Sequence, residues 1–194
     1  MIPPSEPSLE ELDVLPEVAD QFQGAFGLDT PPATLAEWVD ATSPLVQTAT
    51  FQERFDHRFR TSSSRHQISA PERNYYIGLF DTLLVPFIRG DVREFTIRSE
   101  SPVSERVIDV QVDAGEPSIA PDDAVMSFGV ATDVVSAEYF EVPAHIAYAR
   151  FNKYTNAFGG IPAYERWARN IPDIETMRIP LSVGVVLAKR LMTR

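Results

Sequence analysis

A single apolar segment, YYIGLFDTLLVPFIRG at residues 75–90, constrains the fold more than any other part of this sequence. Its spacing predicts one helix over residues 73–89 that is apolar on nearly every side, which is typical of a helix buried within a core. One acid, Asp81, interrupts the segment between Phe80 and Leu83. Because a lone carboxylate is costly to bury, the chain must give this acid a partner or keep it protonated.

Length and composition limit what surrounds this helix. The 194 residues, 44% of them hydrophobic, suit one compact domain with a small appendage. No window approaches ~18 consecutive apolar residues, so neither a transmembrane segment nor a membrane partner is expected. The first residues lack the basic and apolar regions of a signal peptide, and a cytoplasmic location is expected.

The chain contains no cysteine, which excludes disulfides, thiolate metal ligands and thiol nucleophiles. The histidines are too dispersed for a local zinc motif. No metal and no other cofactor is therefore predicted.

Charge is distributed unevenly along the sequence. No Lys or Arg precedes Arg54, whereas ten acidic residues do, and the net charge is −11. Five arginines then follow closely: Arg54, Arg58, Arg60, Arg65 and Arg73. The overall negative charge argues against nucleic acid as a partner. The arginine-rich stretch has two interpretations, a solvated and salt-bridged surface or a patch that docks phosphate or an acidic partner.

Residues 1–70 are predicted to form a helical N-terminal region. Helical segments are expected to break at Pro16 and to stop at Gly27. A third helix capped by Ser43, followed by a hairpin over residues 55–70, would make this region resemble a winged-helix module. A plain helical cap with a hairpin fits the pattern equally well, and the helix that would enter a DNA groove carries no positive charge.

Residues 71–194 are predicted to form an α+β core domain in which a mixed β-sheet packs on the buried helix. Alternating hydrophobicity after Gly90 predicts strands at residues 92–101, 104–115, 122–132 and 140–151. The last of these would carry His145. Helices are predicted over AYERWARN and at the C-terminus.

Two interpretations of Asp81 follow from the residues alone. On a helix it shares a face with Gly78, Thr82 and Val85, so the acid lies beside a position that has no side chain. If it is buried alone, desolvation raises the pKa of its carboxyl, and the protonated acid would then serve as a proton donor. Alternatively, a backbone or hydroxyl partner satisfies the carboxyl, and its role is to shape the core.

The buried segment resembles the core helix of the alkylmercury lyases (organomercurial lyases), whose pattern is roughly Tyr-x-Trp-Cys-Ala-x-Asp-Thr-Leu-x-x-Pro. The matching residues here are Tyr75, Asp81, Thr82, Leu83 and Pro86. Later stretches agree in order: REFTIRSESP and DAVMSFGVA are similar to two strands of that family, and RFNKYTNAFGGIPAYERWA to its Phe-Cys segment and the Trp-bearing helix that follows. The resemblance covers about residues 55–193.

The resemblance implies protonolysis of carbon–mercury bonds, in which two cysteine thiolates hold the mercury ion and an aspartic acid helps to move the proton to carbon. It assigns Asp81 to the proton-donor position, Gly78 to the first cysteine position and Asn152 to the second. Glycine offers no ligand atom, and asparagine offers only a hard amide oxygen. The resemblance therefore predicts little or no activity of that kind in this chain.

Other functions stay open on the same scaffold. A site for a small molecule or an organometal would combine a few polar side chains with apolar walls; the candidates are Asp81, Thr82, Asn152, Tyr75 and Tyr154. A hard metal ion held by Asp81, Asn152 and His145 is a weaker alternative, because the three residues are dispersed in the sequence. A regulatory or interaction module, resembling a transcription regulator, would use the arginine-rich hairpin.

Overall fold

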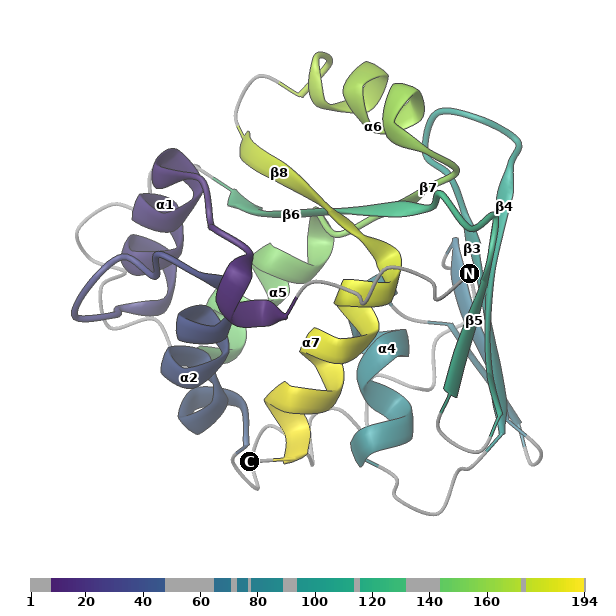
Figure 1. The fold of residues 1–194 in the computed structure, drawn as a ribbon, viewed down its shortest axis with the longest axis horizontal. Coiled ribbons are helices and arrows are strands. Elements are labelled where there is room, and N and C mark those ends of the chain that lie inside the picture. The colour runs from purple at the N-terminus through teal and green to yellow at the C-terminus, as the bar shows by residue number, and fades with distance from the viewer. Residues whose placement is uncertain are drawn as a thin grey trace.

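The fold is α+β, with six α-helices and two β-sheets in the part of the chain that the structure describes (Figure 1). This computed structural model describes residues 8–47, 65–70, 73–76, 78–88, 94–113, 116–131, 144–171 and 174–193. A short 3-10 turn, η1 (Leu9–Glu11), comes first. The helices are α1 (Pro16–Phe26), α2 (Leu35–Val46), α4 (Leu79–Ile88), α5 (Ala144–Lys153), α6 (Ile161–Ala168) and α7 (Leu181–Thr193).

The sequence predicts one mixed sheet, whereas the described strands form two sheets in which every pairing is antiparallel. The first sheet has the order β2-β1-β3-β4-β5 and the second the order β7-β6-β8. The strands are β1 (His66–Ala70), β2 (Arg73–Tyr76), β3 (Phe95–Glu100), β4 (Val107–Asp113), β5 (Glu116–Ala120), β6 (Val125–Ala131), β7 (Ala157–Phe158) and β8 (Ile174–Pro180). Short connections within the first sheet allow neighbouring strands to run in opposite directions, whereas parallel neighbours need a long crossover.

The three-stranded sheet is covered on both faces (Figure 1). Because successive side chains of a strand point to opposite faces, β6 contributes to two hydrophobic clusters. On the face toward α1 and α5 it adds to the main core Met126, Phe128 and Val130. On the face toward α6, Val125 joins a smaller cluster with Phe158, Tyr164 and Trp167.

α4 is the buried helix that the sequence predicts, but it begins later than predicted. Residues 79–86 of α4 are all buried, and the helix packs against α7 and against β1 and β3. Residues 73–76 form β2 instead of the first helical turn, and they pair with β1 from Ala70 opposite Arg73. The tyrosines of β2 have a high strand propensity, and β1 provides backbone partners for pairing. Gly78 separates this strand from the helix.

The strand predicted over residues 140–151 is wrong, because α5 occupies Ala144–Lys153. The alternation of apolar and polar residues in this segment misled the prediction. Its alanines favour a helix, and Ala147 and Phe151, one turn apart, are both buried on one face of α5.

The first N-terminal helix begins and ends at the expected signals. α1 has Pro16 at its start and ends at Gly27, whose φ of 65° is left-handed. α2 begins at Thr34, whose hydroxyl accepts a hydrogen bond from the backbone N–H of Glu37 at 3.2 Å. α2 continues past Ser43, so that residue does not cap a third helix.

The segment that would complete a winged-helix module, residues 48–64, lies outside the described residues. The returning strand of the predicted hairpin is present as β1, which pairs with β2 and β3. Residues on both sides of the predicted boundary at residue 70 share one hydrophobic core, including Phe22, Trp38, Phe128 and Phe151. Within the described ranges, no helix combines the length and the hydropathy needed to cross a membrane.

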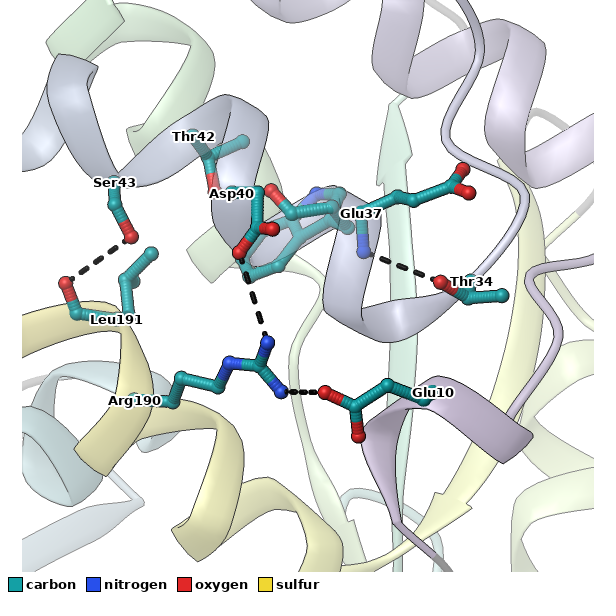
Figure 2. Close-up of polar contacts among 9 residues, drawn as sticks. Glu10, Thr34, Glu37, Asp40, Thr42, Ser43, Arg190 and Leu191 are labelled. Carbon is teal, nitrogen blue, oxygen red and sulfur yellow. Dashed lines mark hydrogen bonds and ion pairs between the residues drawn. The ribbon is translucent and has the colours of Figure 1, made fainter. Parts of the chain in front are cut away.

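Polar contacts tie the N-terminal elements to the end of α7 (Figure 2). Arg190 of α7 contacts the carboxylate of Glu10 in η1, and its second amino group lies 3.8 Å from Asp40 in α2. The hydroxyl of Ser43 donates to the backbone carbonyl of Leu191 at 3.4 Å. Ser43 therefore satisfies a carbonyl at the end of α7, where the helix itself supplies no partner.

Candidate functional site

Asp81 lies in the first turn of α4 and is 3% exposed. This turn begins at Gly78, whose carbonyl accepts a hydrogen bond from the N–H of Thr82 at 3.0 Å. The unpaired N–H groups and the dipole at a helix start favour a negatively charged side chain. The sequence predicts Asp81 near the middle of a longer helix, and the later start of α4 gives the acid a more favourable environment than that.

α5 brings Asn152 into contact with Asp81 although the two residues are 71 positions apart. Nδ2 of Asn152 donates to Oδ2 of Asp81 at 2.6 Å. A side-chain amide from a distant helix thus satisfies this oxygen, where the sequence alone suggests a backbone or hydroxyl partner. Asn152 is 8% exposed, and its Oδ1 is buried and accepts no hydrogen bond from the residues that the structure describes.

Gly78 lies directly against the same amide. A Cβ added at Gly78 would lie 2.6 Å from both Cγ and Oδ1 of Asn152, well inside the distance at which non-bonded atoms pack. The three positions to which the resemblance assigns the mercury chemistry, Gly78, Asp81 and Asn152, therefore meet at one place. The amide of Asn152 fills the space that a side chain at position 78 would need.

The other candidate pocket residues have separate surroundings. The hydroxyl of Thr82 donates to the carbonyl of Leu79 at 2.6 Å, so its hydrogen bond stays within α4. Tyr154 follows α5, is partly exposed, and has the ammonium of Lys153 5.0 Å from the centre of its ring. Tyr75 lies on β2, not on the helix, and its side chain is outside the described part.

The hard-metal alternative is supported only in part. Asp81 and Asn152 are in contact, and His145 lies two turns before Asn152 on α5, while its side chain is outside the described part. Among the described residues, no group of three or more His, Asp or Glu is placed to hold a metal ion.

Aromatic side chains flank the polar contact. Phe80 and Phe151, the residues immediately before Asp81 and Asn152, pack with ring centroids 5.0 Å apart. Trp38 of α2 contacts both rings, with centroids 6.3 Å from Phe80 and 5.4 Å from Phe151. The sequence does not predict this meeting of three helices, because helices distant in sequence leave no local pattern of their contact.

A second buried polar contact lies in the five-stranded sheet, and the sequence does not predict it. Nδ1 of His66 on β1 lies 2.7 Å from Oγ of Ser99, which is opposite it on β3. Burial, and secondarily the positive charge of Arg65, lowers the pKa of His66 to about 4, so the ring is neutral at pH 7. One signal could have indicated this burial: His66 and Ile68 are two positions apart in a strand, so their side chains lie on the same face of the sheet.

Comparisons with known proteins agree with this geometry. The sequence profile of the alkylmercury lyase (MerB) family matches residues 59–193, which is more than half of the chain and includes α4 and α5. A solved structure, described as the crystal structure of the mercury-bound form of MerB2, is similar with a TM-score of 0.52 and 16% identity, over 95% of this chain and 93% of that chain. At this identity the structural likeness establishes the fold. No curated protein shows significant sequence similarity. The chain, although it has no cysteine, belongs to the alkylmercury lyase family.

Proposed function

We propose that this protein does not cleave carbon–mercury bonds by thiolate-assisted protonolysis and that it binds a small molecule on the scaffold of its family. The observation that carries the proposal is the contact between Asn152 and Asp81. Nδ2 of the amide donates to the carboxylate at 2.6 Å, while Oδ1 is buried and unpartnered among the described residues.

The chemistry of the family needs soft ligands that this chain lacks. Mercury prefers sulfur donors, and electron donation from two thiolates weakens its bond to carbon. The chain has no cysteine, Gly78 has no ligand atom, and Asn152 carries a hard amide oxygen. Asp81 keeps the proton-donor position that the resemblance gives it, but a proton donor by itself does not hold the metal.

The unpartnered amide oxygen indicates the class of ligand. A buried acceptor without a hydrogen bond costs about 1–3 kcal/mol. A ligand N–H or O–H group that donates to Oδ1 of Asn152 would offset this cost, and the adjoining carboxylate of Asp81 favours a donor with positive charge. The packed rings of Phe80 and Phe151 make the surroundings of this contact apolar. The ligand is therefore a small organic amine or amide with an apolar body.

The first test is the protonolysis of phenylmercuric acetate under excess free thiol, followed by benzene release. We expect no release by the native chain above the background of thiol alone. The matched variant is Gly78→Cys/Asn152→Cys, which restores both thiols beside Asp81 and is expected to release benzene. Turnover by the native chain would overturn the first half of the proposal.

The second test is a thermal-shift comparison of the native chain with Asn152→Ala. The probes are methylammonium, benzylamine and benzamide, each at increasing concentration. A ligand that binds only the folded state raises the Tm with its concentration. We expect benzylamine or benzamide to raise the Tm of the native chain and not that of the variant. Equal shifts in the two proteins, or no shift with any probe, would contradict ligand binding by Asn152.

A further inference from the structure

We propose that Asn152 determines which residues position 78 can hold. The amide of Asn152 fills the space of a side chain there, so only glycine fits. This inference deepens the proposed function, on which it rests for the importance of the site, because it names the residue that sets what the site can contain. Its test measures folding and needs no ligand, so its failure is distinguishable from the failure of ligand binding.

The contact leaves no room for a side chain at position 78. A Cβ on Gly78 would lie 2.6 Å from Cγ and from Oδ1 of Asn152, and closer still to Nδ2. Non-bonded carbon atoms pack at about 3.5–4.0 Å. Even alanine at position 78 therefore requires one of the two residues to move by about 1 Å.

The constraint at position 78 differs from that at the glycines with a left-handed backbone. Among the described glycines, those with φ in the left-handed range are Gly27, at 65°, and Gly160, at 117°. Gly78 is not one of them, so a left-handed backbone is not the constraint that the structure shows at this position. The collision with Asn152 is what excludes a side chain.

Asn152 is held in place from two directions. Its amide is hydrogen-bonded to Asp81 at 2.6 Å, and the preceding residue, Phe151, is fully buried with its ring 5.0 Å from that of Phe80. Rotating the amide away would break the hydrogen bond to Asp81, and shifting the helix backbone instead would displace the packed ring of Phe151. Because protein interiors are close-packed, neither change is easily absorbed.

The two vacated thiol positions are therefore not independent. A side chain at position 78, including a thiol, fits only after Asn152 has been replaced by a residue that leaves the space open. The space beside Gly78 is not empty, because the amide of Asn152 occupies it. Replacing the glycine alone therefore cannot place a side chain there. Asn152 is thus the residue that determines whether position 78 can carry a side chain.

The test is a double-mutant cycle with four proteins: the native chain, Gly78→Ala, Asn152→Ala and the double variant. We expect Gly78→Ala to lower the Tm by about 3–10 °C in the native background, because it overpacks a buried contact. In the Asn152→Ala background, the same change is expected to leave the Tm unchanged or to raise it, since alanine restricts the unfolded chain more than glycine does. The non-additivity of the two changes measures the steric coupling directly.

Gly24 of α1 provides the matched control, because a Cβ at this exposed helical position would meet nothing within 4 Å. Gly24→Ala is expected to keep or raise the Tm. If Gly78→Ala does not fold but the double variant does, the steric coupling is larger than the cycle can measure, and the proposal is supported. If Gly78→Ala lowers the Tm equally in both backgrounds, or has no effect in the native one, Asn152 does not determine the residue at position 78.

Discussion

Two neighbouring contacts between α4 and α5 differ although they are one residue apart. Phe80 packs on Phe151 with both rings fully buried, and this contact leaves no polar atom unsatisfied. Next to it, Asp81 accepts a hydrogen bond from Asn152, but the amide keeps an unpartnered oxygen among the described residues and excludes any side chain at Gly78. The aromatic contact joins the two helices without leaving a polar atom unsatisfied. A neighbouring contact that adds a cost is typical of a functional site.

The largest expected effect comes from breaking the aromatic contact. Phe151→Ala removes a fully buried ring that packs against Phe22, Trp38, Phe80 and Phe128. The expected loss in the free energy of unfolding is about 3–5 kcal/mol, measured by urea denaturation. Ile161→Ala is the control, because Ile161 is 42% exposed on α6 and its loss is expected to stay within about 0.5 kcal/mol. A loss below about 1 kcal/mol for Phe151→Ala would mean that the rings do not hold the two helices.

The polar contact is tested by Asn152→Asp, which replaces the amide donor with a second carboxylate. At pH 7 the two carboxylates repel each other in a buried place, and we expect a loss of about 2–4 kcal/mol in the free energy of unfolding. Repulsion raises the pKa of one carboxyl in the folded state, so part of this stability should return as the pH falls from 7 to 5. Urea unfolding at both pH values measures the change.

Asn152→Leu is the control for that experiment, because it removes the donor without adding a charge. The difference in stability between this variant and the native chain should vary less with pH than the difference for Asn152→Asp. If the two variants show the same pH dependence, repulsion with Asp81 is not the cause of the loss.

The contact between His66 and Ser99 extends the comparison to a buried polar pair in the sheet. The folded-state pKa of His66 is lowered to about 4 from 6.5. Above pH 6.5 the ring is neutral in both the folded and the unfolded chain, so its protonation does not reduce the stability of the fold. As the pH falls toward 4, the unfolded chain takes up a proton that the folded chain does not, and stability is lost at about 1.4 kcal/mol per pH unit. His66→Gln should show a shallower fall in stability between pH 6.5 and pH 4 in urea titrations at a series of pH values. Identical slopes for the native chain and the variant would show that His66 does not titrate in this way.

Local signals in the sequence predict much of the fold. Gly27 ends α1, and the apolar run after Gly78 forms the buried helix α4. The errors arise where a partner strand overrides the local pattern or where two local signals conflict. Residues 73–76 became strand β2 because β1 was available to pair with them, and residues 144–153 became α5 although their pattern partly alternates.

The candidate site could be predicted only in part. The resemblance to a family selects Gly78, Asp81 and Asn152, and the structure brings these three residues together. Nothing in the local sequence indicates that the amide of Asn152 occupies the side-chain space of Gly78. A glycine that is required by a neighbour rather than by its own backbone is indistinguishable in sequence from one required by a turn.

The smallest expected effect comes from comparing two helix starts. α2 begins with Thr34, whose hydroxyl accepts a hydrogen bond from the N–H of Glu37 at 3.2 Å, whereas α4 begins with Gly78, which has no side chain to offer. Thr34→Ala is expected to cost about 1 kcal/mol in the free energy of unfolding and Thr34→Gly only a few tenths, because a glycine leaves the first N–H groups open to other partners. Urea denaturation of the two variants measures the difference. If Thr34→Gly costs as much as Thr34→Ala, a glycine is a poor helix start in this protein, and α4 would need a compensating contact at Gly78. If it costs little, the glycine of α4 is tolerated at a helix start, and its packing against Asn152 is sufficient to explain why no other residue stands there.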